Sequence, residues 1–190
     1  MNTNIMIVGV GGQGTLLASR ILGSVNAIRG KDVKISEVHG MSQRGGSVVT
    51  YVRYGEEIYS PIIDKGCADY ILAFEKLEGY RFLPYLKPTG KIIINDTEIM
   101  PMPVIMGKME YPQDIYKKIS SSFSLDIIPA NELADELGNK KCQNVIIIGY
   151  FASLSDIPHD TWIEALRTNV KPEFLDLNLK AFDLGYNYKK

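Results

Sequence analysis

The stretch that decides the fold is IMIVGVGGQGT, residues 5–15. It begins with a short apolar run that ends in glycine, which is typical of a strand buried on both faces. From Thr15 to Arg29 apolar residues recur at helical spacing, and Gly30 is placed to end that helix in the left-handed conformation. A second strand is expected from Val33 to Val38. Together these signals predict a strand–helix–strand unit with a glycine loop at its first turn.

The rest of the chain continues the alternation of strands and helices. Further strands are predicted at Ser47–Tyr54, with a hairpin return at Ile58–Tyr59, and at Tyr70–Phe74, Lys91–Ile94 and Leu125–Ile128. Helices are predicted at Glu75–Leu86 with interruptions, Asp114–Ser122, Glu132–Leu137 capped by Asn131, Asn144–Leu154, Asp160–Thr168 and Lys171–Leu184. The stretch Asn144–Leu154 is apolar nearly all round, so by periodicity alone it could also be a strand. The pattern predicts one α/β domain over residues 1–190, Rossmann-like, with a mostly parallel sheet, an antiparallel hairpin and a helical C-terminal segment.

Composition excludes several classes of protein. The 190 residues carry a formal net charge of −1, so a generally basic nucleic-acid binder is not expected. No apolar run approaches the roughly 18 residues of a membrane span, and no positive charge precedes the first apolar run as in a signal peptide. The only cysteines, Cys67 and Cys142, are too few for a zinc site or an iron–sulfur cluster. We therefore expect a cytoplasmic protein with reduced thiols and no metal centre of its own.

The first glycine loop supplies five candidate binding residues, Gly9, Gly11, Gly12, Gln13 and Gly14. Glycines between a strand and a helix let the backbone approach a ligand, and the helix start offers free N–H groups to an anion. The spacing also matches the dinucleotide-binding pattern G-x-G-x-x-G, with Glu37 near the position of its acidic residue. The alternative is that these glycines only allow the helix and strand to pack closely. A triphosphatase loop is excluded because Thr15 occupies the place of the required lysine.

A second polar loop follows the second strand, at the sheet edge where α/β proteins bind ligands. Its candidate residues are Ser42, Gln43, Arg44, Gly45 and Gly46. The planar guanidinium of Arg44 suits a phosphate, a carboxylate or an acidic residue of a partner. The alternative is an ordinary surface ion pair of little energetic value.

These motifs, taken in order, resemble a known family. The sequence GVGGQG at 9–14 is followed by SQRGG at 42–46, SPII at 60–63 and ADYILAFE at 68–75. This set resembles the gamma-type domain of the 2-oxoacid:ferredoxin oxidoreductases, over nearly the whole chain. The longer form EVHGMSQRGG at 37–46 is most similar to the small (beta) subunit in the indolepyruvate branch of that family.

The resemblance implies a role in oxidative decarboxylation of a 2-oxoacid to acyl-coenzyme A, with electrons passed to ferredoxin. In this branch thiamine diphosphate and the iron–sulfur clusters belong to the large alpha subunit, and this chain would bind no redox cofactor. The sequence agrees, because it has two cysteines and no Gly-Asp pair of a thiamine diphosphate motif. The glycine loops would then either hold coenzyme A or only contact the alpha subunit. Ferredoxin would be an indirect partner, and nucleic acid and membranes would not be partners.

Two rival functions stay open at this point. The first is an independent NAD(P)-dependent oxidoreductase, although no catalytic tyrosine–lysine pair stands out after the glycine motif. The second is a binding module with no enzymatic partner. An isolated subunit would leave its partner surface uncovered, which often drives pairing of two copies as a homodimer.

Two further features are expected to act through packing and capping. Four of the seven methionines lie within residues 100–109, where MPMP predicts a stiff extended stretch. We interpret this segment as a partner interface, with a buried edge strand as the alternative. Asp69 and Glu75 bracket a predicted strand and are interpreted as capping or partner contacts, not as an acid–base pair.

Overall fold

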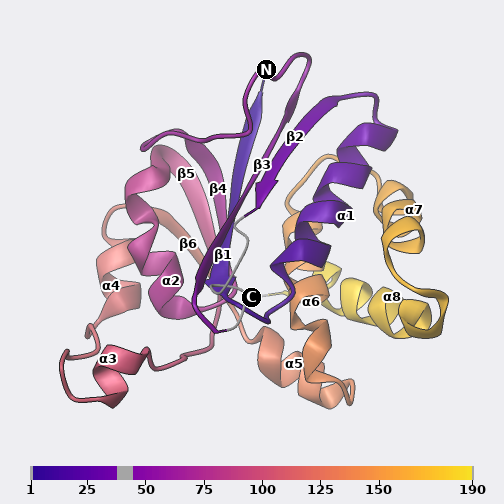
Figure 1. Ribbon diagram of the computed structural model, residues 1–190. Helices are drawn as coiled ribbons and strands as arrows, with labels where there is room; N and C mark the ends of the chain where they lie inside the picture. The colour runs from indigo at the N-terminus through magenta and orange to yellow at the C-terminus, as the bar shows by residue number, and fades with distance from the viewer. Residues whose placement is uncertain (1, 38–44, 190) are drawn as a thin grey trace.

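The computed structural model describes residues 2–37 and 45–189, in which six strands form a sheet (Figure 1). The strands are β1 (Thr3–Val10), β2 (Asp32–Glu37), β3 (Ser47–Gly55), β4 (Ala68–Ala73), β5 (Leu86–Asn95) and β6 (Ser124–Ile128). Their order is β2-β3-β1-β4-β5-β6. The pairs β1–β4, β4–β5 and β5–β6 are parallel, whereas β3 is antiparallel to both β1 and β2. The predicted α/β fold with a mostly parallel sheet is thus confirmed.

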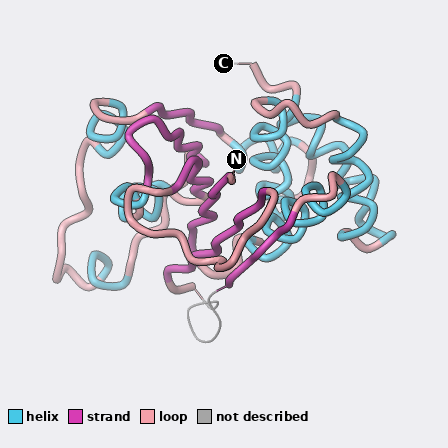
Figure 2. The backbone as a smooth tube through the Cα atoms, turned by 90° about the horizontal axis from the view of Figure 1, so that it is seen from above, coloured by secondary structure: helices cyan, strands magenta, loops and turns pink. Residues whose placement is uncertain are grey.

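Helices cover both faces of this sheet. They are α1 (Thr15–Ile28), α2 (Lys76–Arg81), α3 (Met102–Ile105), α4 (Ile115–Ser120), α5 (Ala130–Glu136), α6 (Gln143–Ser153), α7 (His159–Asn169) and α8 (Pro172–Tyr186), with short 3-10 turns η2 (Leu83–Tyr85) and η3 (Lys140–Cys142). Helices α1 and α5–α8 lie on one side of the sheet, and α2–α4 lie on the other (Figures 1 and 2). Within the described residues, no helix has the length and apolar character needed to cross a membrane.

The alternation of side chains along β1 explains the two layers. Ile5 and Ile7 face the core formed with α1, α6 and α8, while Met6 and Val8 face the core formed with α2 and α4. All four side chains are fully buried, as the apolar run predicts for a strand covered on both faces. Burying both faces fixes the strand register, because a slip by one residue would exchange the two cores.

Helix α6 is the central element of the thicker layer. Its residues from Asn144 to Ala152 are buried all round, because it packs between the sheet and α8. Such a helix needs no polar face, which is why its sequence lacks an amphipathic pattern. The predicted helical C-terminal segment is confirmed by α6, α7 and α8.

The predicted hairpin return at Ile58–Tyr59 is wrong. Strand β3 already pairs with β1 on one edge and with β2 on the other, so it has no free edge for another strand. The following loop is instead held by side chains: the Ile58 N–H donates to Asp32 Oδ2 at 2.8 Å, and Arg53 Nη1 donates to the Ser60 carbonyl at 2.7 Å. The antiparallel element of the sheet is therefore β3 inserted between two strands.

Two local predictions also need correction. Asn131 lies inside α5, which has Pro129 at its N-cap position, and does not cap that helix. Its side chain accepts a hydrogen bond from Asn95 and donates one to Thr97, so it ties α5 to the end of β5. The MPMP segment is extended at Pro101 (φ −69°, ψ 151°) but not beyond it, because residues 102–105 form the single helical turn α3. Proline in the first turn is compatible with a helix, since its missing N–H has no intrahelical partner there.

Candidate functional site

The first glycine loop lies at the carboxyl edge of the sheet, between β1 and α1 (Figure 1). Gly12 and Gly14 adopt left-handed backbone angles, with φ of 99° and 83°. Gln13 closes the loop from within: its Oε1 accepts from the Val10 N–H at 2.7 Å, and its Nε2 donates to the Phe74 carbonyl at 2.8 Å. Both polar ends of Gln13 are engaged inside the protein, which gives this side chain a positioning role.

The glycines of this loop serve different purposes. A Cβ atom on Gly9 would lie 2.8 Å from Gln13 Oε1, and one on Gly14 would lie 2.3 Å from Asn144 Nδ2. At Gly9 a Cβ would also press on Phe74 Cβ at 3.1 Å, and at Gly14 the left-handed φ of 83° adds to the clash, so packing and backbone conformation together explain these two glycines. Gly12 differs, because a Cβ there would meet nothing within 4 Å. Its exposed, left-handed backbone is the part of the loop that leaves room for a ligand.

Free N–H groups accompany this open backbone. Within the described residues, the structure records no acceptor for the backbone N–H groups of Gly12, Thr15 and Leu16. By contrast, the Gly11 N–H donates to the Gly46 carbonyl at 2.8 Å. Unpaired N–H groups at the start of a 14-residue helix carry partial positive charge and attract anions.

A pocket of about 260 Å³ adjoins these groups. It is lined by Gly11, Gly12, Gly14, Thr15, Leu16, Val48 and Thr50. The walls come from the glycine loop, the first turn of α1 and the start of β3. A volume of this size suits a phosphate or pyrophosphate group and is too small for a whole nucleotide coenzyme. We call this the glycine pocket.

The second loop reaches the same edge. The Gly46 carbonyl accepts from the Gly11 N–H, so this end of the loop lies against the first glycine loop. Ser42, Gln43 and Arg44 lie outside the described residues. Their roles stay predictions.

Two buried carboxylates behind the loops were not predicted as part of the site. Glu78 is 3% exposed and accepts hydrogen bonds from Ser47 Oγ and, at 2.6 Å, from Arg81 Nη1. Glu75 is 1% exposed and accepts from the N–H groups of Glu78 at 2.8 Å and Ile99 at 3.1 Å. Burial raises the pKa of Glu75 above its usual range. The pair anchors the start of β3 and the backbone of Ile99 to the start of α2.

Glu75 caps α2, as the sequence predicted. Asp69 lies at the other end of β4, where it accepts from the Asn4 N–H at 2.8 Å and from Lys87. The two carboxylates are therefore no acid–base pair. Among the residues that the structure describes, no group of three or more metal-binding side chains is arranged to hold an ion.

The dinucleotide interpretation fits this geometry poorly. In dinucleotide-binding folds the second strand lies beside the first, and its acidic residue is free to bind ribose. Here β3 separates β2 from β1, and Glu37 accepts a hydrogen bond from Ser19 Oγ of α1 at 2.7 Å. Glu37 thus has a partner inside the protein.

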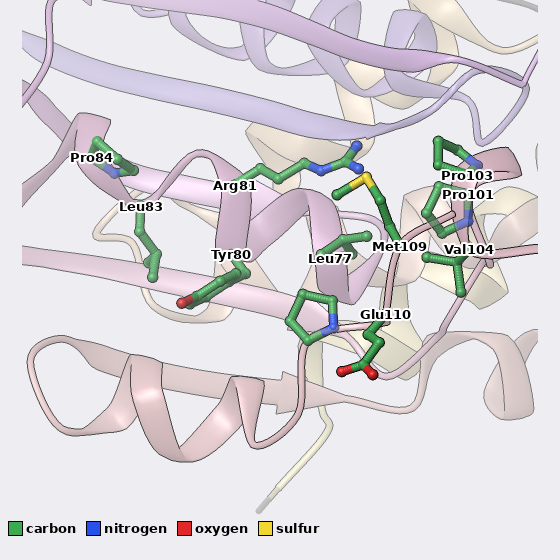
Figure 3. Close-up of a pocket in the computed structure, with 11 residues that line it drawn as sticks. Leu77, Tyr80, Arg81, Leu83, Pro84, Pro101, Pro103, Val104, Met109 and Glu110 are labelled. Atoms are coloured by element: carbon green, nitrogen blue, oxygen red, sulfur yellow. The ribbon is translucent and has the colours of Figure 1, made fainter. Parts of the chain in front are cut away.

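An apolar pocket of about 470 Å³ opens between α2 and the segment that carries α3 (Figure 3). Leu77, Tyr80 and Leu83 form one side, and Pro101, Val104 and Met109 form the other. The methionines of this segment are exposed, Met102 by 64% and Met106 by 57%. A buried edge strand is therefore excluded for residues 99–109, which we call the methionine segment.

The sequence is similar to those of known proteins. Residues 4–188 match the family described as "Pyruvate ferredoxin/flavodoxin oxidoreductase". The protein named indolepyruvate oxidoreductase subunit IorB is 40% identical in Pyrococcus horikoshii, over 98% of this chain and 96% of that protein. The protein of the same name in Thermococcus kodakarensis is 40% identical, over 98% of this chain and 96% of that protein. The one in Archaeoglobus fulgidus is 37% identical, over 98% of this chain and 95% of that protein.

Solved structures agree on the fold. The keto/oxoacid ferredoxin oxidoreductase gamma subunit of Geobacter sulfurreducens aligns with a TM-score of 0.75 at 21% identity, over 98% of this chain and 95% of that one. The 2-oxoglutarate:ferredoxin oxidoreductase of Magnetococcus marinus was solved with 2-oxoglutarate, coenzyme A and succinyl-CoA bound. It also aligns with a TM-score of 0.75 at 21% identity, over 97% of this chain but only 30% of that longer chain.

The fold and the glycine pocket define a Rossmann-like α/β protein with a glycine loop at the carboxyl edge of its sheet. More specifically, the chain belongs to the pyruvate ferredoxin/flavodoxin oxidoreductase family.

Proposed function

We propose that this chain is the small subunit of a cytoplasmic indolepyruvate:ferredoxin oxidoreductase. The complete enzyme would decarboxylate an arylpyruvate, join the acyl group to coenzyme A and pass two electrons to ferredoxin. The observation that carries the proposal is the identity of 36–40%, over 98% of the chain, to four proteins named as subunits of indolepyruvate oxidoreductase.

The redox chemistry belongs to a large alpha subunit in this proposal. Thiamine diphosphate and the iron–sulfur clusters would be bound there, and this chain would supply binding and orientation. The distribution of its cysteines supports the division, since Cys67 is exposed and Cys142 is buried on its own. Two separate thiols do not provide the four ligands that a cluster needs.

The glycine pocket is proposed to receive the phosphates of coenzyme A. The unpaired N–H groups of Gly12, Thr15 and Leu16 would donate to a pyrophosphate, which Gly12 can approach closely because it has no side chain. Arg44 would add a bidentate contact from the second loop. Gln13, Gly9 and Gly14 would hold the shape of the loop. In the architectural alternative the same loops contact only the alpha subunit.

Kinetics of the assembled enzyme separate these two roles. If Arg44 binds a phosphate, Arg44→Ala raises the KM for coenzyme A about tenfold and changes kcat little, because a binding contact is lost before and during the reaction. Arg20→Ala, an exposed arginine on α1, is the matched control and keeps the wild-type KM. An unchanged KM in Arg44→Ala would assign the loop to the subunit interface.

The methionine segment and its neighbouring pocket are proposed to contact the alpha subunit. Methionine adapts to partner surfaces, and the apolar pocket in Figure 3 offers a socket for apolar side chains of the partner. Met106→Lys would place an ammonium group in that contact. Ile28→Lys, at an apolar residue that is 43% exposed on α1, is the control.

Purification under anaerobic conditions tests the subunit assignment directly. The tagged chain, expressed with its native partner, is expected to bring down a brown protein that oxidises indolepyruvate with coenzyme A and a viologen acceptor. Met106→Lys is expected to lose most of this partner and Ile28→Lys to keep it. A colourless, solitary wild-type chain that binds NAD(P) in a titration would contradict the proposal.

A further inference from the structure

The methionines that the structure describes fall into two classes of exposure. Met6 on β1 is fully buried, as is usual for methionine in a folded protein. Four others are 43–64% exposed and belong to the methionine segment: Met100, Met102, Met106 and Met109. The segment therefore presents four thioether sulfurs to solvent within ten positions of the chain.

The fold holds this segment at both of its ends. At the entry, the Ile99 N–H donates to the buried carboxylate of Glu75 at 3.1 Å, and Lys76 Nζ pairs with Glu98 at 3.0 Å. At the exit, the ring centroid of Tyr111 lies 6.0 Å from the same Lys76 Nζ, within the range of a cation–π contact. Residues at the start of α2 thus close the base of the loop. The exposure of its methionines is a property of the fold.

An exposed thioether reacts with oxidants that transfer one oxygen atom. A hydroperoxide gives its terminal oxygen to the methionine sulfur, so that the O–O bond breaks and an S–O bond forms. The proton of the hydroperoxide passes to the remaining oxygen, which leaves as an alcohol, or as water when the oxidant is hydrogen peroxide. The sulfur loses two electrons and the peroxide gains them. Met6 is shielded from this reaction because no part of it reaches solvent.

Oxidation changes the surface that the segment offers to a partner. Met109 lines the apolar pocket, on the side opposite Leu77 and Tyr80 (Figure 3). A sulfoxide converts this flexible apolar side chain into a polar one. Covering it in an interface removes the hydrogen bonds that water makes to the sulfoxide oxygen, which opposes binding.

We propose that the methionine segment is a reversible oxidation site that controls assembly, because its sulfoxide form does not dock on the alpha subunit. This inference rests on the proposed function, in which the segment contacts that subunit. The oxidant is a hydroperoxide. Methionine sulfoxide reductases reverse the reaction, as two thiols become a disulfide and the oxygen leaves as water. Assembly covers the sulfurs, so the free chain is the sensitive form.

Timed treatment of the free full-length chain with hydrogen peroxide tests the site itself. A Cys67→Ser background is used, because the exposed thiol of Cys67 also reacts with peroxide. Peptide mass spectrometry is expected to show sulfoxides in the methionine segment at least about tenfold faster than at Met6, and methionine sulfoxide reductases with dithiothreitol should remove them. Equal rates in the folded chain would overturn the proposal.

Copurification with the coexpressed alpha subunit tests the effect on assembly. The test variant is Met100→Gln/Met102→Gln/Met106→Gln/Met109→Gln, in which polar amides imitate sulfoxides. In the matched control the same four residues are replaced by leucine, which stays apolar and keeps a similar volume. The glutamine variant is expected to retain less than about a tenth of the partner that the wild type retains, and the leucine variant to retain all of it. Equal thermal unfolding of both variants excludes a folding defect.

The outcomes separate this inference from the proposed function. A wild-type chain that copurifies with no alpha subunit overturns both. A glutamine variant that assembles as fully as the leucine variant overturns the oxidation site alone and leaves the subunit assignment in place. Loss of the partner in the leucine variant would assign the effect to side-chain shape instead of polarity, and this too would overturn the oxidation site.

Discussion

The crossing of α6 and α8 makes a sharp prediction about stability. Gly149 on α6 faces the backbone of α8, and a Cβ built there would lie 2.1 Å from the Phe182 carbonyl oxygen. Gly185 on α8 faces α6 in return, with its Cβ 2.0 Å from the Ile146 carbonyl oxygen. Both obstacles are backbone atoms, which cannot rotate away as a side chain can. The close contact between α6 and α8 therefore depends on a glycine in each helix.

The cost of Gly149→Ala follows from this geometry. Real Cβ atoms essentially never approach within 3.0 Å of such an atom, so the helices would have to separate by roughly 1 Å. Overpacking of this kind costs about 3 kcal/mol where the backbone must move. Alanine also stabilises a helix by about 1 kcal/mol relative to glycine, which offsets part of this cost. The expected net loss is about 2 kcal/mol, or about 4–8 °C in Tm for a chain of this size.

Urea denaturation followed by circular dichroism measures this loss. The matched control is Gly23→Ala in α1, where the Cβ would meet only the flexible end of Ile35, and we expect little change there. The losses of stability in Gly149→Ala and Gly185→Ala should also not be additive in the double variant, because one separation of the two helices relieves both clashes. Losses that add fully in the double variant, or a Gly149→Ala protein as stable as the control, would refute the reasoning.

Three further predictions concern single residues. Iodoacetamide at mildly alkaline pH should alkylate the exposed Cys67 but leave Cys142 unmodified until the protein unfolds, because burial raises the pKa of the Cys142 thiol. Peptide mass spectrometry measures the modification of each cysteine. Gly14→Ala should lower the free energy of unfolding by about 2 kcal/mol, because the left-handed φ strains alanine and the new Cβ would clash with Asn144. Denaturant unfolding should show a smaller loss for the control Gly138→Ala, where φ is similar but a Cβ would meet no neighbour. Burial raises the pKa of Glu75 above its ordinary value of 4.5, so its contribution to stability is lost as the pH rises through the raised pKa. The free energy of unfolding of the wild type, measured relative to Glu75→Gln over a pH series, should therefore fall from pH 4.5 upward, and a constant difference would exclude this group as the cause.

Local sequence signals predicted the elements of the fold better than their arrangement. The apolar run before Gly9 is buried on both faces, and Gly30 ends α1 in the left-handed conformation as expected. The insertion of β3 between β1 and β2 could not be read from its residues, because any strand rich in β-branched residues can pair with several neighbours. The predicted return strand at Ile58–Tyr59 failed for this reason, whereas an antiparallel pair of the sheet is formed by β2 and β3.

The same limit applies to the site. The glycine loop was visible because its residues are contiguous and its conformation needs glycine. Glu78 was not, because its contact with Ser47 joins residues 31 positions apart, and an acidic residue in the first turn of a helix usually faces solvent. The pocket that Leu17, Lys141 and Phe174 line together was equally hidden, since these residues belong to three distant segments.

The close contact between α6 and α8 also constrains how the chain is made. Gly149 leaves the ribosome 36 residues before Gly185, which corresponds to roughly 2–7 s of synthesis at typical rates. During that interval the apolar surface around Ile146 has no α8 to cover it. A stop codon shortly before residue 172 would leave that surface bare permanently. The docking of α8 is therefore the step that covers this apolar surface during synthesis.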